Sequence, residues 1–258
     1  MAALAGTSVW ITGAGSGIGR SCAIAFAGAG ARLALSGRRR EALEETAALL
    51  PEAAKVAIIP CDMGDAEAVA SAHRDVVAAI GDPNILINNA GMNIARRHWK
   101  DLSIDDVTRL VDVDLVALFA STIAVLPAMR TAGQGTLIHI ASVAAIHFNP
   151  VSGGAYTAAK QGVLGLSDSI NAEEGIHGIR SICICPGETE TPILALRPVP
   201  LTAQERALMA QPDDIAAAAL FAATLPQRAC VTRLVLSPTN DRFWRADAER
   251  IAAMPPKR

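Results

Sequence analysis

A tyrosine and a lysine four residues apart are the groups in this sequence whose spacing best suits chemistry. Tyr156 is the only tyrosine of the chain, and Lys160 follows it in Tyr-Thr-Ala-Ala-Lys. Residues at i and i+4 share a helix face, so the ammonium can lower the pKa of the phenol and make it a usable proton donor and acceptor. Such pairs also arise by chance on many helices, so the pair alone does not identify an active site.

A serine fourteen residues before the tyrosine could act on the same substrate. Ser142 directly follows an apolar run, Thr136–Ala141, that predicts a strand. A hydroxyl at the end of that strand could donate a hydrogen bond to the oxygen that Tyr156 protonates, which is how a polarised carbonyl is held for hydride attack. The three side chains together predict acid–base chemistry at a carbonyl or an alcohol.

A glycine-rich segment near the start of the chain has the pattern of a phosphate-binding loop. The strand-like run Ser8–Ile11 leads into Thr12–Gly19, with the sequence T-G-A-G-S-G-I-G, and a helix-like segment follows at once. Glycines permit tight turns and close approach of amides to a pyrophosphate, while the helix N-terminus adds partial positive charge. Glycines also mark ordinary turns, so the position after the first strand carries the prediction of a dinucleotide-binding loop.

Three arginines follow the second predicted strand. A dinucleotide fold that prefers NAD usually has an acidic residue there, about twenty residues after the glycines, to bind the adenosine ribose. Here Gly37 is followed by Arg38, Arg39 and Arg40, and cations at the start of a helix oppose its dipole, so helix stability does not explain them. A bound 2′-phosphate would explain them, because each charge-assisted contact with an arginine contributes about 1.5–3 kcal/mol. The three arginines therefore predict NADP(H) as the cofactor. The alternative is a solvated basic turn paired with the glutamates of residues 41–45.

These features share their order and spacing with a known family. The chain resembles the classical short-chain dehydrogenase/reductase family over nearly its whole length. The matching motifs are Thr12–Gly19 (T-G-x-x-x-G-x-G), Asn88–Gly91 (N-N-A-G), Ser142 with Tyr156 and Lys160 (Ser and Y-x-x-x-K), and Pro186–Gly187 followed by Thr191. The resemblance implies an α/β fold with a single Rossmann-type doubly wound parallel sheet of about seven strands, and hydride transfer between a nicotinamide and a secondary alcohol or ketone.

The resemblance also implies roles for residues by position. Tyr156 would be the general acid and base, Lys160 would lower its pKa and hold the nicotinamide ribose, and Ser142 would orient the substrate oxygen. Asp62 and Met63 resemble the pair that contacts adenine. The positions that would bind NADP(H) are Gly13, Ser16, Gly17, Ile18, Gly19, Arg38, Arg39, Asp62, Met63, Asn89, Ala90, Gly91, Tyr156, Lys160, Pro186, Gly187, Thr189 and Thr191.

One catalytic position departs from the family pattern. Asp114 stands where the family usually has an asparagine that holds a water in the proton relay to the lysine. A negative charge there would raise the pKa of Lys160 and alter the pH dependence; an aspartate that bonds amides within its own helix is the alternative. With Ile182, which replaces a second frequent asparagine, this departure leaves open a catalytically weak or inactive NADP(H)-binding sensor or scaffold. An epimerase or dehydratase is a further alternative. Such relatives have a larger subdomain in this part of the chain, and the residues after Thr191 leave little room for one.

Candidate substrate residues follow the predicted site. We expect residues 191–211 to form a lid, because in the family this segment closes over the nicotinamide; Leu194 is one of its apolar side chains. His147 is a second candidate for the pocket wall. Glu188 could select a cationic or polyhydroxylated substrate, or equally pair with a lid arginine such as Arg197. The expected substrate is a medium-sized, partly apolar carbonyl compound or alcohol.

Apolar runs and helical windows predict the frame that positions these residues. The runs lack the polar alternation of a half-exposed sheet, which indicates strands covered on both faces. They are Ser8–Ile11, Arg32–Ser36, Val56–Cys61, Ile85–Asn88, Thr136–Ala141, Ile179–Cys185 and Arg233–Leu236. Helical windows lie between them, at Gly19–Gly28, Arg40–Leu50, Ala66–Ile80, Ser103–Arg130 and Tyr156–Glu174. Strands alternating with helices predict a doubly wound α/β fold. Capping boxes are expected at Ser103/Asp106 and Thr202/Glu205.

Composition limits the class of protein. The chain has 258 residues, 51% hydrophobic, and a formal net charge of -2, which predicts one domain over residues 1–258 and no nucleic-acid partner. The most apolar stretch, Leu115–Met129, is short for a membrane span, so we expect no membrane partner. Five cysteines without metal-ligand spacing indicate reduced thiols, no metal, and a cytoplasmic location.

The resemblance further implies a homodimer or homotetramer. It would be built partly from the helices after Ser103 and after Tyr156. In the second helix, five small residues would permit close approach of another helix: Ala155, Ala158, Ala159, Gly162 and Val163.

Overall fold

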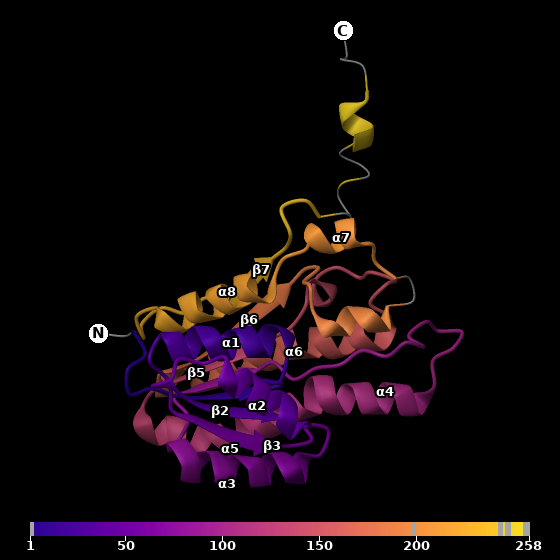
Figure 1. Cartoon of the computed structure of the whole chain (residues 1–258). Coiled ribbons are helices and arrows are strands. Elements are labelled where there is room, and N and C mark those ends of the chain that lie inside the picture. Colours follow the sequence, from indigo (N-terminus) through magenta and orange to yellow (C-terminus); the bar gives the residue numbers. More distant parts are fainter. Residues whose placement is uncertain (1–2, 198–199, 242–244, 246–248, 255–258) are drawn as a thin grey trace.

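The computed structural model describes residues 3–197, 200–241, 245 and 249–254. Its sheet has seven parallel strands in the order β3-β2-β1-β4-β5-β6-β7 (Figure 1). They are β1 (Ser8–Thr12), β2 (Arg32–Gly37), β3 (Val56–Pro60), β4 (Ile85–Asn88), β5 (Gly135–Ile140), β6 (Ile179–Pro186) and β7 (Arg233–Leu236). Every predicted strand is present with ends within one residue, and the predicted parallel α/β fold is confirmed.

Helices cover both faces of this sheet. Helices α1 (Gly17–Gly28), α2 (Arg40–Ala48) and α8 (Pro212–Thr224) contribute to one apolar cluster, and α3 (Ala66–Ile80), α5 (Ala117–Ala132) and α6 (Gly154–Glu174) to the other. Figure 1 shows α1 and α8 on one side of the strands and α3 and α5 on the other. Neighbouring strand residues point to opposite faces, so Trp10 joins one cluster and Ile11 the other, both with no exposed surface.

The edge strands depart from the expectation that both faces are covered. In β7, Arg233 and Val235 are exposed while the residues between and after them are half-buried, and β3 is only partly buried along most of its length. An edge strand has a neighbour on one side only, so fewer helices reach its surface. The expectation therefore holds for the central strands and is wrong at the two edges.

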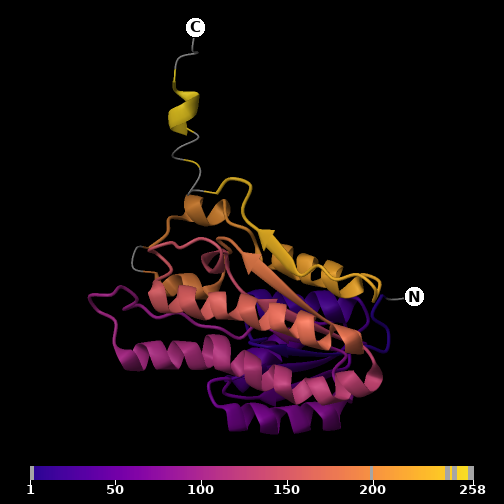
Figure 2. The same cartoon turned by 180° about the vertical axis from the view of Figure 1, so that it is seen from behind.

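Helix α4 (Ile104–Val111) continues into α5 through a π-helical turn, Asp112–Val116. This composite helix is long and apolar enough to cross a membrane by length and composition alone, a test that core helices of globular proteins also pass. It packs beside α6 (Figure 2), and Ser121 on it donates a hydrogen bond to the Asn88 side chain of β4 at 2.7 Å. Its outer side chains Phe119 and Ile123 are exposed. The expected absence of a membrane partner stays a prediction.

The two predicted capping boxes differ in the structure. Helix α7 (Ala203–Ala207) begins with the complete Thr202/Glu205 box. At α4 the Ser103 hydroxyl accepts from the Asp106 amide, but the Asp106 carboxylate accepts from that hydroxyl and from Arg96 and does not reach the Ser103 amide. The Asp106 carboxylate is instead held by the Ser103 hydroxyl and the Arg96 guanidinium. Further 3₁₀ turns cover Val143–Ala145, Gly175–His177 and Pro192–Leu196.

The small-residue face of α6 is largely used inside the chain. Ala159 and Val163 are buried, and a Cβ at Gly162 would lie 2.8 Å from a methyl carbon of Leu115. Close approach of the α4–α5 helix therefore accounts for these small side chains. Of the five residues expected at a subunit contact, Ala158 is exposed and Ala155 and Gly162 are partly exposed, so the expected contact through this helix stays a prediction.

Candidate active site

A cavity of about 500 Å³ opens at the carboxyl ends of the strands. Strands β1 and β4 are neighbours, and the chain leaves them toward opposite edges of the sheet. In open α/β sheets this change of direction leaves a crevice in which ligands bind. The loops after β1, β2, β4, β5 and β6 all contribute to the wall, so the motifs found along the sequence meet in one place.

The three residues proposed for acid–base chemistry lie together on this wall. Ser142 follows β5, and its hydroxyl accepts a hydrogen bond from the Ala144 amide at 3.1 Å. Tyr156 and Lys160 share one face of α6, with the Lys160 ammonium 5.6 Å from the centre of the tyrosine ring. Lys160 donates to the carbonyl of Ile140, the last residue of β5, at 3.2 Å. The carboxyl end of β5 thus positions both the serine and the lysine.

Burial sets the acidity of the tyrosine. It raises the pKa of Tyr156, and Lys160 and a hydrogen bond with Ser142 lower it only in part, so the pKa lies above its usual value. The predicted effect of Lys160, a lowering of the tyrosine pKa, is confirmed in direction, and burial outweighs it in the net pKa. Burial lowers the pKa of Lys160, but Asp114 and Tyr156 raise it by more, so the net pKa lies above its usual value. The lysine is therefore a persistent cation beside the phenol.

Asp114 lies behind these residues and not on the cavity wall. It belongs to the π-helical turn, is fully buried, and its Oδ1 accepts from the Met92 amide at 2.7 Å. The alternative in which Asp114 bonds amides of its own helix is thus not the observed arrangement. Its Oδ2 is buried with no hydrogen-bond partner among the described residues. Burial raises the pKa of Asp114, opposed by Lys160 and the Met92 amide.

Gly91 separates the aspartate from the lysine. A Cβ at this position would lie 3.1 Å from Asp114 Oδ1 and 3.3 Å from Lys160 Nζ. Any side chain would therefore crowd both charged groups. Glycine in the Asn-Asn-Ala-Gly segment lets the backbone run between a buried carboxylate and a buried ammonium.

The glycine loop is held from below by Asn89. Its side-chain amide donates to the carbonyls of Thr12 and Gly13 at 3.0 and 3.1 Å, and the Thr12 hydroxyl accepts from the Asn89 and Ala90 amides. Gly19 packs beneath this loop: a Cβ there would lie 2.3 Å from the Gly13 carbonyl oxygen. Gly19 therefore does not line the cavity, which corrects its predicted direct contact with the cofactor; it allows the loop to fold.

The start of α1 fits the phosphates of a dinucleotide. Ser16 is its N-cap residue but makes no side-chain capping bond, and the first turn has no acidic residue. The helix thus presents its first amides and positive dipole end to the cavity. Gly17 has a positive φ of 52°, and a Cβ there would lie 3.2 Å from the Thr191 side chain. The residues present therefore fit a nicotinamide dinucleotide stretched from this loop toward Tyr156.

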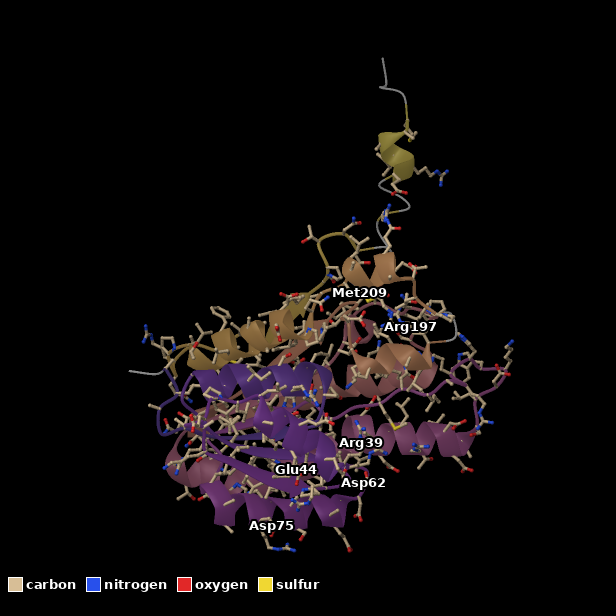
Figure 3. All side chains as sticks on the ribbon, in the orientation of Figure 1. Arg39, Glu44, Asp62, Asp75, Arg197 and Met209 are labelled. Atoms are coloured by element: carbon tan, nitrogen blue, oxygen red, sulfur yellow. The ribbon has the colours of Figure 1, made fainter. Side chains whose placement is uncertain are left out.

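The adenosine end has basic residues and no acidic residue at the end of β2. Arg38, Arg39 and Asp62 all line the cavity, and Figure 3 labels Arg39 and Asp62 in the same region of the molecule. Arg40 pairs with Glu44 at 3.6 Å, but none of the ion pairs among the described residues involves the other two arginines. The alternative of a glutamate-paired basic turn thus describes Arg40 alone.

Most of the predicted site residues lie on the cavity wall. Those that line it are Gly13, Ser16, Gly17, Ile18, Arg38, Arg39, Asp62, Met63, Asn89, Ala90, Gly91, Ser142, Tyr156, Lys160, Pro186, Gly187, Glu188, Thr189, Thr191 and Leu194. His147 is exposed and is not among the wall residues. Its neighbours Ala144 and Asn149 do line the cavity, so the expected place of His147 in the pocket wall is corrected.

The predicted lid contributes to the substrate end of the cavity. Glu188 pairs with Arg197 at 2.7 Å, one of the two roles considered for it, and Figure 3 labels Arg197 in this upper part of the molecule. A bridge between Thr189 and Ala210 anchors the segment, while Pro198 and Val199 lie outside the described residues. Among the buried wall residues that the sequence did not point to is a cation, Arg97, which no local motif marks.

Comparison with known proteins agrees with this geometry. The profile of the short chain dehydrogenase family matches residues 7–198. The chain belongs to the short-chain dehydrogenase family. The chain is 33% identical over 246 residues to sulfoacetaldehyde reductase 2 of Chromohalobacter salexigens, covering 93% of this chain and 97% of that one. It is 34% identical over 190 residues to the NAD(+)-dependent 2-dehydro-3-deoxy-L-rhamnonate dehydrogenase of a Sphingomonas species, covering 74% and 75%.

A solved relative has the same fold. The alcohol dehydrogenase of the archaeon Thermococcus sibiricus, complexed with 5-hydroxy-NADP, superposes on this chain with a TM-score of 0.82 at 26% identity, covering 92% of this chain and 98% of the other. The family and its Rossmann-type sheet make this chain an oxidoreductase that uses a nicotinamide cofactor.

Proposed function

We propose that this protein is an NADP(H)-dependent short-chain oxidoreductase that interconverts a secondary alcohol and its ketone. The observation that carries the proposal is the meeting of Ser142, Tyr156 and Lys160 on the wall of the cavity that also contains the glycine loop. Proton donor, oxygen-binding hydroxyl and dinucleotide site then share one space. Leu194 and Leu196 of the lid segment line the same cavity.

The chain's own residues handle the proton and the oxygen. A nicotinamide bound in this cavity supplies or accepts the hydride. Ser142 donates a hydrogen bond to the substrate oxygen, and Tyr156 gives its proton to that oxygen in reduction or takes it in oxidation. Lys160 stabilises the phenolate form because its buried ammonium lies over the ring. Its bond to the Ile140 carbonyl fixes the ammonium in place.

The basic adenosine end supports NADP(H) as the cofactor. Arg38 and Arg39 line the cavity where an acidic ribose partner would favour NAD, and Gly37 supplies no carboxylate. The archaeal relative was solved with an NADP derivative, whereas the Sphingomonas relative is named for NAD. The proposed preference for NADP(H) therefore rests on the charges of this chain. Comparing kcat/KM with NADPH and with NADH tests it.

Cofactor turnover with and without the tyrosine tests the proposed reaction. The wild-type protein should consume NADPH in the presence of some members of a panel of ketones, aldehydes and sugars, and reduce NADP with the corresponding alcohols. Tyr156→Phe should lower kcat about 10²- to 10⁴-fold, because it removes the proton donor. Its NADPH affinity, measured by fluorescence titration, should change little.

Two results would contradict the proposal. If Tyr156→Phe turns over the same substrate at the wild-type rate, the tyrosine is not the acid and base. If NADPH binds tightly but no panel member is reduced or oxidised, the protein is the cofactor-binding sensor that its unusual aspartate left open. Faster turnover with NADH than with NADPH would overturn the cofactor preference alone.

A further inference from the structure

A buried arginine lies at the substrate end of the cavity, and the acid–base residues do not use it. Arg97 is on the cavity wall and only 5% exposed. Its guanidinium donates to three carbonyl oxygens from separate segments: Nε to Ile94 at 2.7 Å, Nη1 to Val151 at 3.2 Å, and Nη2 to Leu196 of the lid segment. A guanidinium has five N–H donors, so these three bonds fix its orientation without exhausting it.

The positive charge of this arginine has no carboxylate partner in the described part of the chain. The ion pairs there include Arg197 with Glu188, but none includes Arg97. Burial lowers the pKa of Arg97, the nearby charge of Arg197 lowers it further, and Tyr156 raises it. Arginine nevertheless stays protonated in proteins. The charge of Arg97 thus interacts with Tyr156, the group that transfers the proton.

Carbonyl oxygens solvate such a cation but do not neutralise it. A buried charge costs free energy unless an opposite charge comes close, and the guanidinium fork suits carboxylate, sulfonate and similar oxyanions. Glu188 already neutralises Arg197 at 2.7 Å, so an unbalanced positive charge remains beside Tyr156. An anion entering the cavity would compensate it.

We propose that the substrate carries a carboxylate or sulfonate, and that Arg97 binds this group while Ser142 and Tyr156 hold the reacting oxygen. The inference rests on the proposed function, because it assumes a carbonyl or alcohol at the tyrosine. It also replaces the expected selection of a cationic substrate by Glu188, since that carboxylate is paired with Arg197. The fixed guanidinium then sets both the charge and the orientation of the substrate.

Matched substrates and a neighbouring arginine test the proposal. We would measure kcat/KM for short oxo-carboxylates and oxo-sulfonates and for the methyl ester of each acid, with wild type, Arg97→Gln, Arg97→Lys and Arg96→Gln. Arg96 is the control because it is adjacent but its side chain is 69% exposed and pairs with Asp106. The wild type should prefer the acids over their esters by about 10- to 100-fold. Arg97→Gln should abolish this ratio, Arg97→Lys should keep part of it, and Arg96→Gln should keep it whole.

The outcomes separate a binding role from a structural one. A residue that only ties three loops together would lower turnover of acids and esters alike, so an unchanged ratio in Arg97→Gln would overturn the proposal. An equal or greater preference of the wild type for the esters would overturn it too. Comparing kcat/KM for the oxo-carboxylates with kcat/KM for the oxo-sulfonates shows which oxyanion Arg97 binds.

Two further measurements keep the test independent of folding and of turnover. If Arg97→Gln does not fold, wild-type inhibition decides: a carboxylic acid should compete with an ester substrate, and its amide should not. If no panel member is turned over, the proposed function fails, and calorimetric titration of the NADPH-loaded protein decides the inference separately. Binding of the acids but not the esters would support it, and equal binding would contradict it.

Discussion

At the scale of single residues, Asp114 changes the electrostatics of proton transfer. Its charge raises the pKa of both Tyr156 and Lys160, so Asp114→Asn should lower both. Alcohol oxidation needs the deprotonated tyrosine and therefore rises with pH through its pKa. The acid limb of the kcat/KM profile should move to lower pH in Asp114→Asn.

The matched control for this prediction lies in the same π-helical turn. Asp112→Asn also removes a carboxylate, but Asp112 is partly exposed and should leave the profile unchanged. Superposed profiles of wild type and Asp114→Asn, or a shift to higher pH, would show that the aspartate is uncharged in the working enzyme or acts through structure alone. Steady-state alcohol oxidation from acid to basic pH is the measurement.

Short spacing made the catalytic residues predictable, whereas Arg97 required the folded chain. Tyr156 and Lys160 are linked by one helical turn and Ser142 by the end of a strand, so local rules locate all three. Arg97 stands beside Arg96, and no pattern tells them apart. Contacts with distant segments decide which one is buried: a Cβ at Gly153 would lie 2.8 Å from the Cβ of Arg97, and the lid carbonyl that it binds comes about a hundred residues later.

At the scale of elements, apolar runs predicted the strands, but several features depend on tertiary packing. The length and continuous apolar character of the runs were sufficient because most strands are buried on both faces. Exposure of β7 depends on its place at the sheet edge, and the π-helical turn before α5 has no sequence signature of its own. Helix α8, which we did not name from the sequence, begins with Pro212 and a Gln211/Asp214 capping box that could have marked it.

Arg180 joins α8 to the sheet and gives a stability prediction. From β6, it donates to the Ala223 and Leu225 carbonyls at 2.8 and 3.1 Å, to two carbonyls in the following loop, and to Thr136 of β5 at 3.0 Å. Arg180→Met removes all of these bonds and leaves the buried Ala223 carbonyl and Thr136 hydroxyl without this donor, so the free energy of unfolding should fall by about 2–4 kcal/mol. Denaturant unfolding measures this loss. Arg228→Met, at an exposed position, should cost much less, and equal losses would mean that the network contributes nothing specific.

At the scale of the whole molecule, the α4–α5 helix presents the surface that best fits a second copy of the chain. Phe119 and Ile123 are 42% and 65% exposed on its outer face, and Val116 adds a further 42% exposed side chain. Contiguous apolar surface of this kind marks contacts between proteins, and most homo-oligomers repeat one self-complementary patch about a two-fold axis. We therefore expect a homodimer or homotetramer that uses this face, while the buried small residues of α6 contribute less than the sequence suggested.

Charges on this face should separate the subunits. Aspartates at positions 119 and 123 would place four carboxylates in an isologous contact, where their desolvation and repulsion oppose association. Light scattering and sedimentation velocity should give a dimer or tetramer mass for the wild type and a monomer mass for the Phe119→Asp/Ile123→Asp variant. Ile176→Asp, on a side chain that is 84% exposed elsewhere, should keep the wild-type mass. A monomeric wild type, or a double variant that stays assembled, would exclude this face as the subunit contact.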